Sequence, residues 1–76
     1  MEEYCGFTNQ ATWNVVLWVM NTEWMYRTVV AGEHPYSPRS AKRMARNLMG
    51  ERTPDRFKLG SLVNWKEVAE AFNEAS

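Results

Sequence analysis

Four basic side chains between residues 39 and 46 form the clearest chemical pattern in the sequence. Their spacing of i, i+3, i+4 and i+7 places them on one face of a helix: Arg39, Lys42, Arg43 and Arg46. Three more basic residues follow, namely Arg52, Arg56 and Lys58, and the whole stretch from 37 to 58 has a local net charge of +5. The pattern predicts an anion-binding surface for a nucleic-acid backbone or an acidic protein patch. An ordinary solvated helix face has the same pattern and is the alternative.

A second charged stripe, of opposite sign, lies near the end of the chain. Glu67, Glu70 and Glu74 are spaced i, i+3 and i+7 and therefore share one helix face. They could pair with the basic residues, either within one chain or between two chains. The alternative is an ordinary solvent-exposed surface with no special role, since exposed ion pairs contribute little to stability and the stripe needs no partner.

The residues that usually carry catalysis are too few to form an active site. His34 is the only histidine and sits beside Glu33 in a loop with Gly and Pro, and a general base also needs a nucleophile and an orienting group. Cys5 is the only cysteine, so no internal disulfide can form, and we expect it to pack as a small hydrophobic residue. One histidine and one cysteine are too few soft ligands for a metal site. We therefore expect a non-catalytic protein without a cofactor or a metal.

Two tryptophans are hard to bury in so short a chain. Trp18 lies on the flank of the first apolar run, and Trp24 lies at the start of the next helical pattern. If both are exposed together with Met25 or Tyr36, they form an apolar patch for a protein partner, and exposed aromatic rings could instead stack on bases. The alternative is that both line the core or a groove.

The element that must organise these residues is the run from Trp13 to Met20, in which seven of eight residues are apolar. A helix that is apolar nearly all round must be covered on nearly all sides, so a helix over about 9–20 is expected to be central. Polar residues precede or enter this run, and a buried structural network explains them without a ligand. They are Thr8, Asn9, Thr12 and Asn14.

Start and stop signals predict four further helices, at about 23–30, 38–49, 54–62 and 65–73. Ser37-Pro38 opens the third helix of the chain and Gly50 ends it. Thr53-Pro54 repeats that opening for a short helix to about Leu62, and Asn64 has capping-box spacing to Glu67. One unbroken helix from 9 to 30 is the alternative for the first two.

Together these patterns predict one all-α domain over residues 1–76, with four or five short helices around the central one. The formal net charge is zero, which gives no overall attraction to nucleic acid or to an acidic membrane. The acidic first residues do not form a signal peptide, and the apolar run is shorter than the roughly 20 residues that a bilayer requires. We expect a soluble cytoplasmic protein with no membrane contact, and small size favours a homodimer.

Two motifs resemble those of a family of small uncharacterised proteins from bacteriophages and bacteria. Residues 8–18 (TNQATWNVVLW) are similar to its opening TN-x-x-TW-x-V-x-LW, and residues 63–70 (VNWKEVAE) are similar to its ending V-[ND]-W-[RK]-E-[IV]-A-E. The motifs cover about a quarter of the chain and leave the middle, from Thr28 to Leu62, unmatched. The resemblance brings no known activity, catalytic residue or cofactor, and implies a small phage-encoded accessory protein.

The expected function follows from this resemblance and from the missing catalytic chemistry. We expect the protein to bind and modulate or inhibit a host protein, such as a defence effector, a polymerase or a regulator. The predicted contact residues are the seven basic residues from Arg39 to Lys58 together with Trp18 and Trp24. The alternative is a nucleic-acid-binding module that uses the basic helix 38–49.

Overall fold

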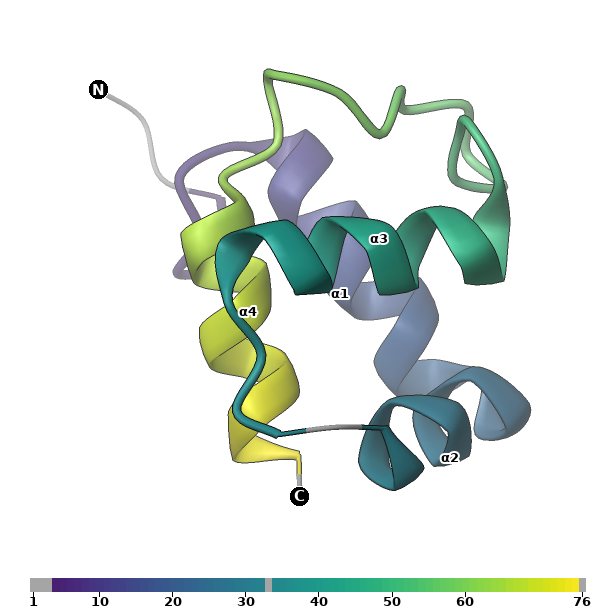
Figure 1. Ribbon diagram of the computed structural model, residues 1–76. Coiled ribbons are helices and arrows are strands. Elements are labelled where there is room, and N and C mark those ends of the chain that lie inside the picture. The colour runs from purple at the N-terminus through teal and green to yellow at the C-terminus, as the bar shows by residue number, and fades with distance from the viewer. Residues whose placement is uncertain (1–3, 33, 76) are drawn as a thin grey trace.

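The chain forms four α-helices, and the last two are joined by a long connection over residues 50–64 (Figure 1). The computed structural model describes residues 4–32 and 34–75. The helices are α1 (Gln10–Asn21), α2 (Glu23–Ala31), α3 (Pro38–Met49) and α4 (Trp65–Glu74). The only β-type pairing among the described residues consists of two isolated bridges, Tyr4–Phe7 and Arg52–Lys58. The all-α prediction is therefore confirmed. No helix in the described part of the chain is long and apolar enough to cross a membrane.

Helix α1 is the central element, as its apolar sequence predicts. None of residues 11 to 20 is exposed, and Val15 and Val19 are completely buried. It packs against both α2 and α4, while α3 covers α4. The remaining core is made of small and medium side chains, with Phe72 and Leu59 as its largest fully buried residues.

A break at Thr22 separates α1 from α2. The backbone of Thr22 is extended, with φ −112° and ψ 109°, so it lies outside both helices. The Asn21 side-chain amide donates to Leu17 O at 2.9 Å within the last turn of α1. The joint predicted at this place is confirmed, and the alternative of one unbroken helix is wrong.

Helix α3 has the start and the end that its sequence indicates. Ser37 and Ser40 form a reciprocal capping box, in which Ser37 Oγ accepts from Ser40 N and Ser40 Oγ accepts from Ser37 N. Gly50 ends the helix with φ 80°, a conformation that favours glycine. Ala41 and Ala45 are fully buried on the inner face, which leaves the predicted basic residues on the outer side.

The helix predicted from Thr53-Pro54 to Leu62 is wrong, because this stretch forms turns. Thr53 Oγ1 accepts from Phe57 N at 3.1 Å, and the Thr53 backbone bonds to Phe57 O and Arg56 N, which closes a tight loop. Arg56 has φ 75°, which a right-handed helix cannot include. The Thr-Pro-Asp signal thus opens a turn here. Leu59 then anchors the loop in the core.

The N-termini of α1 and α4 cap each other. Asn9 Oδ1 accepts from Thr12 N at 2.9 Å to cap α1, and Asn64 Oδ1 accepts from Glu67 N at 3.2 Å to cap α4. Thr12 Oγ1 joins the two caps, since it accepts from Asn64 N at 2.8 Å and donates to Asn9 Oδ1 at 2.7 Å. Thr12 is fully buried, so these bonds are shielded from water.

Three more bonds complete this shared cap. Asn9 Nδ2 donates to Leu62 O at 2.8 Å, and Asn64 Nδ2 donates to Thr8 Oγ1 at 3.0 Å. Thr8 N donates to Glu67 Oε1 at 2.8 Å. The capping box predicted for Asn64 and Glu67 is therefore only half formed, because the Glu67 carboxylate turns to the N-terminal loop instead of to Asn64 N. The structural network expected for the polar residues before α1 is present.

The loop between α2 and α3 is fastened to α4 by Tyr36. Tyr36 N donates to Asn73 Oδ1 at 2.6 Å, and Asn73 Nδ2 donates back to Tyr36 O at 3.0 Å. The phenol of Tyr36 donates to Val29 O at 2.8 Å, and its ring packs edge-on against Phe72. Burial raises the pKa of this phenol, which stays a hydrogen-bond donor at neutral pH.

We expect Asn64→Ala to lower the free energy of unfolding by about 1–3 kcal/mol, because it removes the cap of α4 and leaves buried groups of the shared cap unpaired. Urea unfolding followed by circular dichroism measures this. Ser61→Ala, at an exposed neighbouring residue, is the control and should change stability by less than about 0.5 kcal/mol. Thr8→Ala combined with Asn64→Ala should cost less than the sum of the single changes, since both remove the same bond. Fully additive effects would contradict a shared cap.

Candidate functional site

The predicted basic residues of α3 lie on its outer side. We call Arg39, Lys42 and Arg43 the basic face. Arg39 and Arg43 are exposed and Lys42 is half-buried. Within residues 4–32 and 34–75 the single ion pair joins Arg27 to Glu23, at 3.4 Å on α2. The charges of the basic face are therefore not neutralised by any carboxylate in the described part of the chain.

Two of the other predicted cations have structural contacts. Arg46 Nη1 donates to Leu59 O at 3.2 Å, and Arg52 Nη1 donates to Arg56 O at 3.2 Å. Both guanidinium groups thus hold the loop that follows α3. Arg56 and Lys58 are exposed on that loop.

A small open hollow adjoins the basic face. It has a volume of about 140 Å³ and is lined by Tyr36, Ser40, Arg43, Met44 and Asn47. Arg43 and Asn47 offer N–H donors there, above the apolar surface of Met44. Such a hollow suits one anionic or carbonyl group of a larger partner, and it is too small to enclose a drug-sized ligand.

The two predicted contact tryptophans differ in their surroundings. Trp24 is 56% exposed on α2, and its indole N–H makes no hydrogen bond to a described residue. Trp18 is half-buried, and its indole Nε1 donates to Asp55 Oδ2 at 2.9 Å. Trp24 alone of the two is therefore presented to solvent as a broad apolar surface.

Asp55 ties the turn after α3 to the central helix. Its Oδ2 accepts from Asn14 Nδ2 at 2.8 Å as well as from Trp18. The hydrogen bond from Asn14, and then that from Trp18, hold the pKa of the Asp55 carboxyl below its ordinary value of 3.8, because both stabilise the charged form. Asn14 is 2% exposed, and its Oδ1 has no partner among the described residues. Sequence reasoning missed this bond, since 41 positions separate the two residues.

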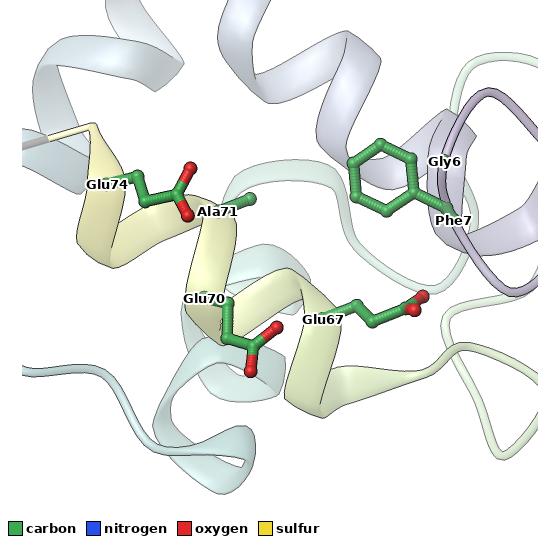
Figure 2. A pocket seen from close by; sticks show the side chains of 6 residues that line it. All are labelled: Gly6, Phe7, Glu67, Glu70, Ala71 and Glu74. Atoms are coloured by element: carbon green, nitrogen blue, oxygen red, sulfur yellow. The ribbon is translucent and has the colours of Figure 1, made fainter.

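The acidic stripe lies beside a hollow between α4 and the N-terminal loop. This acidic groove, of about 150 Å³, is lined by Gly6, Phe7, Glu67, Glu70, Ala71 and Glu74. Figure 2 shows Phe7 facing α4 across the hollow, and the three glutamates extending from successive turns of α4. Glu67 is bonded to Thr8, whereas Glu70 and Glu74 are exposed and pair with no described residue. The pairing with the basic residues within one chain does not occur among the described residues.

The residues with catalytic potential have ordinary surroundings. His34 is exposed, with Nδ1 3.0 Å from Gly32 O and its ring edge-on to Tyr36. Glu33, its sequence neighbour, and the acidic residues 1–3 lie outside the described residues. Cys5 is exposed in the turn before α1 with φ 51°, so the prediction that it packs as a small hydrophobic residue was wrong. No group of three His, Cys, Asp or Glu in the described part is placed to hold a metal ion.

The Asp55 contact predicts a pH dependence. A carboxyl whose folded pKa is lowered stabilises the fold above its unfolded pKa, and this contribution is lost as the pH falls through the folded pKa. We therefore expect the stability advantage of the wild type over Asp55→Ala to be present at pH 6 and to shrink as the pH falls through the folded pKa, which lies below 3.8. Thermal unfolding at each pH measures the difference. In an NMR titration the Trp18 indole N–H should report a midpoint below 3.8. A midpoint above that value would contradict the assignment.

Comparison with known proteins gives the family of the chain. No curated protein and no solved structure matches it. A family model described as a family of unknown function, DUF7249, matches residues 1–75. That range includes both terminal motifs and the middle of the chain, which the motifs do not cover. The similarity therefore extends over nearly the whole fold. The chain therefore belongs to this family, DUF7249.

Proposed function

We propose that this protein is a non-catalytic binding protein that acts by attaching to another protein. The observation that carries the proposal is that the Trp24 indole and the charged groups of the basic face lie at the surface and make no hydrogen bond or ion pair to a described residue. These are the residue types that dominate binding energy in protein interfaces, where a few aromatic and arginine side chains supply most of it.

The energetic argument is strongest for Trp24. An indole ring offers one of the largest apolar areas of any side chain, and 56% of this residue faces water. Covering it with a partner removes that area from water, with a gain of about 25 cal/mol per Å² before association costs. Within an interface, the cations of the basic face would increase specificity and the rate of association more than the affinity.

The biological setting of the proposal rests on the resemblance of the terminal motifs. Because related motifs open and close small phage proteins, we propose that the chain is phage-encoded and works in the host cytoplasm. Its target would be a host protein such as a defence effector, a polymerase or a regulator, which it modulates or inhibits. The motif residues build the shared cap, so target choice would lie outside the two motifs, with Trp24 and the basic face.

Nucleic-acid binding is the second candidate. What supports it is that Arg39, Lys42 and Arg43 lie on one helix face without a neutralising carboxylate among the described residues. What weakens it is the formal net charge of zero, which leaves no long-range attraction to a polyanion.

A pull-down from host lysate with tagged protein tests the protein-binding proposal. We expect one or more specific proteins to be retained after nuclease treatment. Retention should fall at least about tenfold with Trp24→Ala combined with Arg43→Glu, because the aromatic anchor and one cation are lost together. Leu62→Ala is the matched control, since Leu62 is 78% exposed but lies on the turn before α4. Equal loss in the control, or no retained protein, would contradict the proposal.

A salt titration separates the two candidates. If the basic face binds duplex DNA, the logarithm of the affinity falls with the logarithm of the salt concentration, by about 0.9 per neutralised phosphate. Three free cations then predict a slope near −3. We expect instead that fluorescence anisotropy detects no specific DNA or RNA complex at about 150 mM salt. A tight complex whose slope is lowered by Arg39→Gln would favour the second candidate.

A further inference from the structure

We propose that the acidic groove on α4 receives the basic face of a second copy, so that the chain associates with itself through oppositely charged faces. The acidic groove is a surface that the proposed function does not use, whereas the basic face is common to both proposals; the inference does not rest on the proposed function.

The first support is the separation of charge along the chain. Seven of the nine basic residues lie between residues 37 and 58, whereas three of the nine acidic residues line one groove on α4. Only one ion pair, on α2, occurs among the described residues, so this separation is not cancelled inside the monomer. The formal net charge is zero, so two copies do not repel each other overall. A neutral molecule with one positive face and one negative face attracts a second copy of itself.

The second support is matched spacing. Arg39 and Arg43 are four positions apart on α3, and Glu70 and Glu74 are four positions apart on α4. Four residues of α-helix rise about 6 Å, so two such helices laid side by side bring both charge pairs into reach at once. All four of these side chains are exposed. The pairing therefore needs no rearrangement of the fold.

The third support is the chemistry of the groove walls. A long cationic side chain has an apolar stem and a charged head, and it buries the stem where it can. Phe7 and Ala71 offer apolar surface to the stem, while carboxylates of α4 stand beside it for the head (Figure 2). Glu67 uses only Oε1 in its bond to Thr8 N, so its second oxygen adds negative charge at the groove.

The association is expected to be weak and sensitive to salt. Exposed ion pairs contribute little each, so two or three of them give a complex that forms at high protein concentration. Sedimentation velocity of the purified chain, from about 10 µM to 1 mM and at low salt, should show the mean mass rising with concentration. The rise should disappear at about 1 M salt, where charges are screened within about 3 Å. A monomer throughout the concentration range would overturn the proposal.

Charge reversal identifies the faces. We expect Arg39→Glu with Arg43→Glu to abolish association, and Glu70→Lys with Glu74→Lys to abolish it as well. An equimolar mixture of the two variants should associate again, because each reversed face then meets a complementary one. Exchanging Glu23 and Arg27, the α2 ion pair that belongs to neither face, is the matched control and should leave association unchanged.

Each outcome of the charge-reversal test decides the matter. A variant that still associates alone, or a mixture that stays monomeric, would overturn the assignment. Circular dichroism checks the fold of each variant. Arg39→Gln with Arg43→Gln replaces the arginine variant if that variant fails to fold, and Glu70→Gln with Glu74→Gln replaces the glutamate variant. The measurement uses one purified component, so its failure leaves the proposed binding to another protein untouched. Success adds that a second copy competes with that partner for the basic face.

Discussion

The capping of two helix N-termini by one set of side chains is the interaction on which the structure depends. The first N–H groups of any helix lack intrahelical partners, and here the chain satisfies those of α1 and α4 together. Thr12 Oγ1 bonds to the capping residues of both helices, and the bond from Thr8 N to the Glu67 carboxylate joins the two helix starts a second time. These groups are more than fifty positions apart in the sequence, so the shared cap fixes where the first and last helices meet. The middle of the chain then packs around this contact.

That joint also places the acidic groove. Glu67 is drawn toward the N-terminal loop by its bond to Thr8, which brings Phe7 opposite α4 and creates the hollow between them. The basic face has no comparable tie, since α3 is attached through its buried alanines and through Tyr36 at its entrance. The charges of Arg39 and Arg43 can therefore change without cost to the fold, whereas a change of the Glu67 carboxylate removes its bond to Thr8.

The sequence predicts those parts of the fold whose signals are local. Ser37-Pro38, Gly50 and Asn64 act within one helix turn of themselves, and the helix boundaries they predict are those observed. Thr53-Pro54 has the same local signal, but the loop it opens is held by parts of the fold outside it: α1 bonds to Asp55, and the core takes up Leu59. Periodicity likewise places the basic face. It cannot show that Arg46 bonds to a loop carbonyl, because that contact exists only after folding.

The surroundings of the four tryptophans distinguish those that hold the fold together from the one that is exposed. The core is mostly valine and alanine, and the indoles lie around it. Trp13 packs on the ring of Tyr4, Trp18 donates to Asp55, and Trp65 donates to Gly60 O. Each of these rings fastens a loop to a helix. Trp24 has neither a ring contact nor a hydrogen bond from its indole among the described residues, so nothing in the described fold accounts for a tryptophan there. Its exposed ring is the area that the partner proposed above would cover.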